Sequence, residues 1–457
     1  MLRSIASNWL LLVLSAIVNL LITPLVIDGL SSSYYGVWAF INDLTAYSSL
    51  LYFGLGTALV RYISTARQDD NGVVISELVS TVTLMYFGMG LFCLLGMSCI
   101  SPFVGPWLLG DDLSATSRSM IQAATVLIGV QVLLMFVGSA FAGMLHGYER
   151  FDLANAAGMS VLLLRTAAIY LFVQGDNAML QLAVITTCGE ALRVLLLCIL
   201  AHRVSPQLRI RLVNFSTNIL RKIFGFAGAA FVIQLAARLI NYTDTVVIGL
   251  MIGASATAYY SIAATFFVYG AQFSNSVTSV FMPRLAQQFR MNRVGEFRDT
   301  YIRCCSLATL IGTYFAVSVA WLGVPFIRIW IGDEFADEVG WVVIALMVGY
   351  AAQVFYAQAP LVLFQAQGSL RGLAVIRISE GVLNLALSLV LGWFYGINGV
   401  ATATLVSGVL IGLGITPYHS SRAVELPFRT YLVQTLRHSL ACAVVLCVVY
   451  GGLMWFW

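Results

Sequence analysis

Long apolar stretches alternate with short polar connections along the whole chain. Each stretch has about 18–25 residues, enough for a helix to cross a hydrocarbon core of roughly 30 Å. We predict membrane-spanning helices near residues 8–28, 36–60, 77–100, 120–144, 156–173, 179–201, 225–251, 257–281, 300–323, 340–364, 373–395, 398–417 and 439–457. The first stretch is too long for a secretory signal and no small-residue cleavage site follows it, so we expect it to be retained.

Composition and charge agree with a membrane protein. Hydrophobic residues make up 60% of the chain and charged residues 10%, against roughly 45–50% and about 25% in soluble domains. Most of the 24 Lys and Arg residues fall on one side of the predicted spans. By the positive-inside rule, this bias predicts a cytoplasmic N-terminus. The net charge of +4 therefore reflects topology and does not indicate affinity for nucleic acid.

The two halves of the chain carry similar motifs, spaced by about 222 residues. PFVGPWLLGD from Pro102 to Asp111 is matched by PFIRIWIGD from Pro325 to Asp333. Each half has six predicted spans, so both copies start on the same side of the membrane, as in transporters built from parallel repeats. We predict an all-α polytopic membrane protein of two six-helix lobes, arranged as parallel internal repeats, plus one C-terminal helix.

The predicted domains follow from these spans. Residues 1–201 form the N-lobe with helices 1–6, and residues 202–224 form a basic cytoplasmic linker. Residues 225–417 form the C-lobe with helices 7–12, and residues 418–457 hold a cytoplasmic loop and helix 13. The loops are short and the cysteines and histidines lack metal-ligand spacing. We therefore predict no enzymatic activity, no catalytic residues, no cofactor and no resident metal.

Charged side chains lie inside several predicted spans. They are Asp43, Arg165, Glu190, Arg193, Arg238, Asp244 and Glu380. A charge near the bilayer centre costs at least about 2.5–3.5 kcal/mol on insertion scales. We therefore expect these side chains to face protein or a wet cavity.

Polar residues also recur at helical spacing in the first two spans of each half. In the seventh span Gln234, Arg238, Asn241 and Asp244 form one stripe. Asn19 in the first span, Asn42 in the second, and Tyr269 with Gln272 in the eighth belong to similar stripes. Such hydrophilic faces are what a central cavity between two lobes requires.

Each charge also has a structural interpretation. Glu190 and Arg193 are three residues apart and could neutralise each other, and the same holds for Arg377 and Glu380. Arg165 could pair with Glu190 or line the cavity. Arg238 and Asp244 are too far apart around a helix for an ordinary pair, which makes them the strongest functional candidates.

The residue types indicate a ligand. Arginine stays protonated and its fork of donors suits phosphate, so arginines within spans indicate an anionic substrate. A carboxylate at depth is a common coupling site in secondary transporters. Candidate substrate-binding residues are Arg238, Arg165, Arg193, Asn241, Gln234, Asn19, Asn42, Tyr269 and Gln272, and candidate coupling or gating residues are Asp244, Asp43 and Glu190.

Two segments resemble a known family. YYGVWAFINDLTAYSSLLYFGLGTALVRYIS, from Tyr34 to Ser64, is similar to the amino-terminal signature of polysaccharide-biosynthesis flippases. RLINYTDTVVIGLMIGASATAYYSIA, from Arg238 to Ala263, resembles the seventh span of that family. The resemblance covers about residues 10–420 and indicates the O-antigen (Wzx-type) and teichoic acid exporter branch of the multidrug/oligosaccharidyl-lipid/polysaccharide (MOP) exporter superfamily.

The resemblance implies two six-helix lobes in a MATE-like V, set in the bacterial cytoplasmic (inner) membrane. It implies flipping of a polyprenyl-diphosphate-linked oligosaccharide to the outer face by alternating access, coupled to an ion gradient of H⁺ or Na⁺. Arg238 and Asp244 best match the family's motif, whereas Arg165 and Arg193 match it only by location. Expected partners are the lipid-linked glycan, membrane lipid, and the polysaccharide polymerase and chain-length machinery. The thirteenth span departs from the usual even count, so the side of the C-terminus stays open.

Two other functions stay open at this point. A multidrug or cation antiporter of the same superfamily would share the lobes, but should favour an acidic cavity with few arginines. A membrane-embedded polysaccharide polymerase or ligase would be expected to carry large outer loops with catalytic Arg or His. The outer loops of this chain are short.

Overall fold

The computed structural model of the chain describes residues 2–52, 55–68, 72–208, 216, 235–240, 242–412 and 415–455. Within these residues every regular element is a helix. The chain forms two compact units. Unit 1 comprises Met1–Phe231 with Gly253–Ser255, and unit 2 comprises Val232–Ile252 with Ala256–Trp457.

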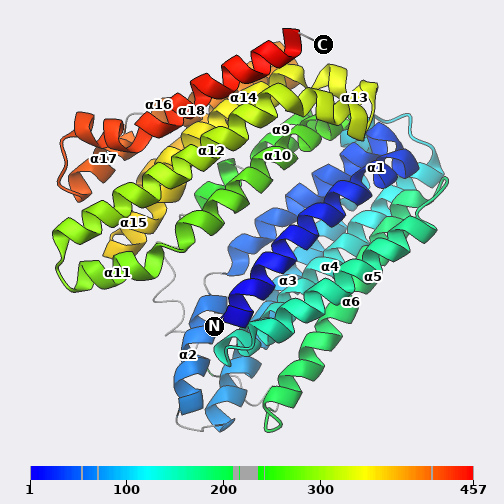
Figure 1. The fold of residues 1–457 in the computed structure, drawn as a ribbon. Coiled ribbons are helices and arrows are strands. Elements are labelled where there is room, and N and C mark those ends of the chain that lie inside the picture. Colours follow the sequence, from blue (N-terminus) through cyan, green and yellow to red (C-terminus); the bar gives the residue numbers. More distant parts are fainter. Residues whose placement is uncertain are drawn as a thin grey trace. The chain divides into compact units, whose positions relative to one another are not determined.

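Unit 1 is organised around one long central helix, α4. Its elements are α1 (Leu2–Ala46), η1 (Tyr47–Tyr52), α2 (Leu55–Gln68), α3 (Gly72–Leu109), α4 (Ala115–Gly147), α5 (Phe151–Phe172) and α6 (Ala178–Val204). Helix α4 packs against both α3 and α6, while α1 packs against α5 (Figure 1). Fully buried apolar side chains such as Leu59, Val82 and Phe136 join α2, α3 and α4.

Unit 2 is built mainly from three long helices, α12, α16 and α18. Its elements are α9 (Thr243–Met251), α10 (Ala254–Ser279), α11 (Met282–Arg290), α12 (Val294–Trp330), α13 (Asp333–Glu338), α14 (Gly340–Gln353), the π-helix η3 (Val354–Gln358), α15 (Ala359–Gln367), α16 (Leu370–Gly412), α17 (Ile415–Ala423) and α18 (Phe428–Trp455). Helix α12 packs against α14 and α18, and α16 packs against α14 and α9.

Eight helical stretches of the described residues are long and apolar enough to cross a membrane. Six of them each coincide with one predicted span: Val74–Leu109, Ala115–Gly147, Phe151–Phe172, Ala178–Val204, Val294–Trp330 and Phe428–Leu453. The other two, Val13–Tyr52 and Arg371–Ala423, each hold two predicted spans. Helix α10 overlaps the predicted span 257–281, and α14 with α15 overlaps 340–364. The protein is therefore an all-helical, multi-pass membrane protein.

The two double-length stretches are each broken at a residue with left-handed backbone. Ser31 has a φ of 70° within α1, and Gly396 has a φ of 60° within α16. Left-handed positions also recur about 222 residues apart, pairing Ser31 with Gly253, Gly110 with Gly332 and Gly175 with Gly396. This recurrence of turns supports the duplication of the lobes, which stays a proposal.

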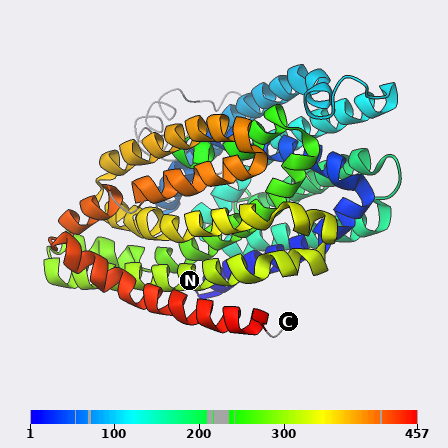
Figure 2. The same cartoon turned by 90° about the horizontal axis from the view of Figure 1, so that it is seen from above.

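The last helix, α18, runs parallel to α12 (Figures 1 and 2). The hydroxyls of Tyr301 and Tyr431 are 3.1 Å apart near the start of both helices, and those of Ser318 and Tyr450 are 3.0 Å apart further along both. Between these pairs, the Thr309 hydroxyl donates to a backbone carbonyl of α18. Because the contacts advance in the same direction along both helices, α18 ends at the end of unit 2 where α12 gives way to α13.

Candidate functional site

Asp244 is a buried carboxylate at the start of α9. It lies in the first turn of that helix and is only 3% exposed. Its oxygens accept hydrogen bonds from the hydroxyls of Tyr260 at 2.7 Å, Ser388 at 3.0 Å and Thr404 at 2.5 Å. Within the described residues its partners are hydroxyl groups, and no cationic side chain forms an ion pair with it.

Two features of the local structure offset part of the cost of burying an ionised carboxylate at Asp244. The N-terminal turn of a helix carries positive partial charge, which stabilises a nearby anion. Hydrogen bonds from hydroxyls to an ionised oxygen are stronger than those between neutral groups. The same arrangement can accept a proton or bind a cation through its oxygens, because none of its contacts is an ion pair.

A polar stripe on α16 extends this site. Arg377, Glu380, Asn384 and Ser388 recur at three- and four-residue steps and are all buried. Arg377 and Glu380 form an ion pair at 2.6 Å. The Asn384 side-chain NH₂ donates to the Thr404 hydroxyl at 3.0 Å, and its Oδ1 has no hydrogen-bond partner among the described residues. We call Asp244, Tyr260, Asn384, Ser388 and Thr404 the Asp244 cluster.

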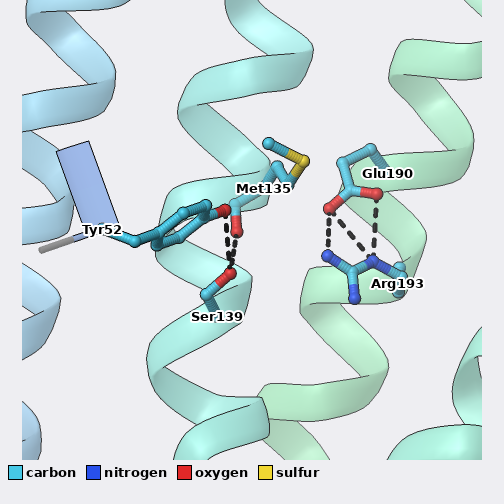
Figure 3. Close-up of polar contacts among 5 residues, drawn as sticks. All are labelled: Tyr52, Met135, Ser139, Glu190 and Arg193. Atoms are coloured by element: carbon cyan, nitrogen blue, oxygen red, sulfur yellow. Dashed lines mark hydrogen bonds and ion pairs between the residues drawn. The ribbon is translucent and has the colours of Figure 1, made fainter. Parts of the chain in front are cut away.

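A second polar centre lies inside unit 1, where α4, α5 and α6 meet the end of η1. Figure 3 shows Glu190 and Arg193 on α6, joined by an ion pair with a shortest distance of 2.6 Å. On α4 the Ser139 hydroxyl donates to the Met135 carbonyl at 2.8 Å and lies 3.2 Å from the Tyr52 hydroxyl. We call Tyr52, Ser139, Arg165, Glu190 and Arg193 the unit 1 charge cluster.

Arg165 reaches this cluster from α5 without forming an ion pair there. Its methylene chain covers Gly189, since a Cβ on that glycine would lie 3.6 Å from the Arg165 Cδ. Its Nε is buried and has no hydrogen-bond partner among the described residues. Glu190 already pairs with Arg193, so Arg165 supplies a positive charge whose donors the neighbouring side chains do not saturate.

Arg238 is also without a carboxylate partner within the described residues. Its guanidinium carbon lies 4.9 Å from the centre of the Tyr242 ring, one helical turn later. A cation over an aromatic ring is attracted by the electron-rich face. Its Nε is a buried donor without a hydrogen-bond partner in the part of the chain that the structure describes. Arg238 therefore resembles Arg165, because the Nε of each is a buried donor that no described residue satisfies.

The remaining predicted residues are less well placed for a shared site. Asn19 and Gln272 are exposed on their helices, and the backbone carbonyl of each accepts a hydrogen bond from a hydroxyl one turn later. The Asn42 amide donates to the Trp38 carbonyl at 2.8 Å, so its side chain bonds its own helix. Asp43 and Tyr269 are half-buried. Gln234 and Asn241 lie outside the described residues.

Four members of the Asp244 cluster were not among the sequence-based site predictions: Tyr260, Asn384, Ser388 and Thr404. A signal for two of them existed in the sequence. Asn384 and Ser388 continue the spacing of Arg377 and Glu380 along the predicted eleventh span. Thr404 lies in the next span and Tyr260 in the eighth, at positions that only the packing of helices could relate to Asp244.

Comparison with protein families identifies the chain. The model of the family described as "Polysaccharide biosynthesis protein" matches residues 1–289, well over half of the sequence. The chain belongs to this family. A provisionally assigned O-antigen transporter of Shigella flexneri is 24% identical over 395 residues, which cover 84% of this chain and 89% of that protein.

Solved structures with the same fold are transporters. An inward-facing multidrug resistance MATE family transporter of the MOP superfamily aligns with a TM-score of 0.74 at 12% identity, covering 92% of this chain and 96% of its own. The lipid II flippase MurJ in an inward closed conformation aligns with the same TM-score and identity, covering 100% and 99%. This member of the polysaccharide biosynthesis protein family thus has the fold of these two MOP-type transport proteins.

Proposed function

We propose that this protein flips a polyprenyl-diphosphate-linked oligosaccharide from the cytoplasmic to the outer face of the bacterial inner membrane by alternating access. The observation that carries the proposal is Arg165, a membrane-embedded guanidinium with a buried Nε that no described residue satisfies. Such a donor suits a diphosphate, which accepts several hydrogen bonds from arginine. The O-antigen transporter among the relatives and the lipid II flippase among the fold neighbours support the same class of substrate.

Each arginine has its own part in the proposed cycle. Arg165 is the candidate contact for the diphosphate head in unit 1, and Arg238 is a separate candidate in unit 2. Arg193 is neutralised by Glu190 at rest, and an entering diphosphate would compete with that carboxylate for the guanidinium. The polyprenyl tail stays in lipid while the head crosses, so no covalent bond is made or broken.

The Asp244 cluster is the proposed coupling site. Its carboxylate accepts hydrogen bonds from hydroxyl groups of α10 and α16, and the Asn384 amide bonds one of these hydroxyls, that of Thr404. Exchange of a proton or Na⁺ there would change the charge in the core of unit 2. That change would alter how α9 and α16 pack, which is how a gradient could drive the lobes through their cycle. Asp43 and Glu190 are weaker candidates for the same role.

The test is complementation of a gene deletion. Loss of the gene should cause a lipid-linked glycan to accumulate on the cytoplasmic face, and the wild-type gene should clear it. Arg165→Gln should reach the membrane at normal levels and fail to clear it. Arg150→Gln is the matched control, because Arg150 lies at the start of the same helix, is 47% exposed and, among the described residues, forms its ion pair with Asp152.

Two outcomes would overturn the proposal. One is full export by Arg165→Gln at the same membrane level as the wild type. The other is a deletion strain that exports its polysaccharide normally but becomes sensitive to organic cations, which would indicate the multidrug antiporter. Measuring glycan accumulation and dye efflux in the same strains separates these two cases.

A further inference from the structure

A cavity of about 990 Å³ opens at one end of unit 1. Its wall is formed by α1 around its break, the start of α4, the end of α5 and the start of α6. All four belong to one unit. The distribution of basic residues predicts that this end faces the outside of the cell. Ligand pockets typically have volumes of roughly 300–1,000 Å³, so this cavity has room for more than one sugar ring.

The cavity has an apolar floor and a polar rim. Buried side chains such as Met120, Ile169 and Met179 form the floor. Asp28, Asp176 and Asn177 stand on the rim and are exposed. Apolar lining with a few oriented polar groups is the usual composition of a small-molecule site.

The polar groups on the rim are available to a ligand. Asn177 occupies the N-cap position of α6, yet its side chain makes no capping hydrogen bond. Asp28 and Asp176 form no ion pair within the part of the chain that the structure describes. Carboxylates and amides of this kind bind neighbouring sugar hydroxyls in pairs, because each side chain presents two polar atoms.

Two tyrosines complete the lining. Tyr34 is held in place by its hydroxyl, which donates to Ser117 at 2.9 Å, and Ser117 is bonded in turn to Ser114 at the N-cap of α4. Tyr170 lies on the rim and is 64% exposed, leaving its ring free to stack. The C–H face of a sugar ring packs on such a ring, so an exposed tyrosine beside carboxylates is typical of carbohydrate sites.

The backbone at the cavity is strained in a way that function can explain. Ser31 lines the cavity with φ 70° and ψ 161°, a region that is essentially restricted to glycine. The matching position in the second half of the chain is a glycine, Gly253. A serine kept in a glycine conformation places a hydroxyl at the cavity that glycine would not supply.

We propose that this cavity binds the sugar portion of the exported glycan, and that it accepts neutral or amino sugars and rejects acidic ones. Its lining contains two carboxylates and no Lys, Arg or His, so uronic acids and phosphate groups are repelled. This inference rests on the proposed function, since it assigns the sugars that the flippase would release on its outer side. In this proposal, arginines bind the diphosphate and carboxylates bind the sugars.

The test uses the purified full-length protein and free sugars, observed by saturation-transfer NMR, which detects weak binding. The probes are N-acetylglucosamine, glucosamine and glucuronic acid. The wild type should bind the first two and show at least tenfold weaker binding of glucuronic acid. The double variant Asp28→Asn/Asp176→Asn should bind glucuronic acid and N-acetylglucosamine about equally, and should lose several-fold in affinity for glucosamine. Asp112→Asn removes a nearby acid that does not line the cavity, and should behave like the wild type.

Tyr170→Ala should weaken the binding of all three sugars, because stacking on the tyrosine ring does not depend on the charge of the sugar. Absence of binding to the wild type, or binding that none of these variants alters, would overturn the proposal. Preferential binding of Ca²⁺ over every sugar, lost in the double variant, would overturn it as well and identify a cation site. The assay does not involve flipping. Sugar binding can therefore fail while Arg165→Gln still blocks export, or succeed while the export test fails.

Discussion

Thr404 donates its hydroxyl hydrogen to the Asp244 carboxylate at 2.5 Å, across 160 positions of sequence. The Asn384 amide donates to the same threonine oxygen at 3.0 Å. This chain of hydrogen bonds joins both halves of α16 to the start of α9. A change of charge at Asp244 therefore acts on two helices of unit 2 at once.

Two substitutions of Asp244 should have different effects, one on ion coupling and the other on the stability of the fold. Asp244→Asn keeps an oxygen that accepts hydrogen bonds from Ser388 or Thr404, so the protein should remain folded while transport loses its dependence on the ion gradient. Asp244→Ala removes the acceptor that the Ser388 hydroxyl uses in the described residues, and a buried unsatisfied group costs about 1–3 kcal/mol. Thermal unfolding in detergent and gradient-driven transport in proteoliposomes measure the two effects. Gradient-dependent transport by Asp244→Asn would exclude Asp244 as the coupling residue.

The Glu190–Arg193 pair should show strong energetic coupling. Arg193→Gln leaves the Glu190 carboxylate, whose side chain is 14% exposed, without its cation. We expect a loss of about 1–3 kcal/mol in the free energy of unfolding. The double variant Glu190→Gln/Arg193→Gln should recover most of that stability and still export poorly, because the guanidinium is absent.

A double-mutant cycle on unfolding, with export measured alongside, checks this prediction. The exposed pair Arg150–Asp152 is the control, and its cycle should give no more than about 1 kcal/mol. Equal coupling energies for the two pairs would contradict the prediction. Normal export by the double variant would limit the pair to a structural role.

Replacement by glycine should stabilise the protein at Ser31 and destabilise it at the neighbouring Ser32. Ser31→Gly relieves a backbone conformation that costs about 1–3 kcal/mol for other residues, so the variant should melt at a higher temperature. Ser32→Gly introduces glycine at a helical position and should lower stability by about 0.5–1 kcal/mol. Melting temperatures of both variants, compared with the wild type, test the assignment. Destabilisation by both would indicate that residue 31 is not held in the left-handed region.

The parallel packing of α12 and α18 predicts the side on which the chain ends. A reporter fused behind α18 should face the same side as the connection between α12 and α13. With a cytoplasmic N-terminus, that side is the periplasm. Alkaline phosphatase should therefore be active there, and green fluorescent protein should not fluoresce. A fusion made at Glu425, before α18 begins, should give the reverse result, and identical signals from both fusions would contradict the packing.

Hydropathy located most of the helices because the bilayer imposes one length on every span. The all-helical fold, the family and the transporter class followed from the sequence and are confirmed by the family match and by the solved structures of the same fold. Hydropathy was less informative for α10. There, short polar turns and hydroxyl-rich faces lower the apolar signal.

The sequence predicted the charged members of the two polar clusters but not the hydroxyl residues of the Asp244 cluster. Asp244 stood out because an unpaired charge in a span is costly, but its partners Tyr260, Ser388 and Thr404 carry no charge. Hydroxyl residues satisfy their own helix backbone so readily that their sequence pattern is weak. The pairing of Glu190 with Arg193 was available from helical spacing, whereas the separation of Arg165 from it depends on how α5 and α6 pack.

The pairing of α12 with α18 has a consequence for biogenesis. The hydroxyls of Tyr301, Thr309 and Ser318 each contact α18, which is synthesised after the other described helices of unit 2. Until α18 leaves the ribosome and inserts, one side of α12 therefore presents these groups to lipid or to the insertion machinery. A chain that stops before α18 would expose the same groups permanently. Membrane quality control could thus recognise truncated copies of this protein although most of its spans are complete.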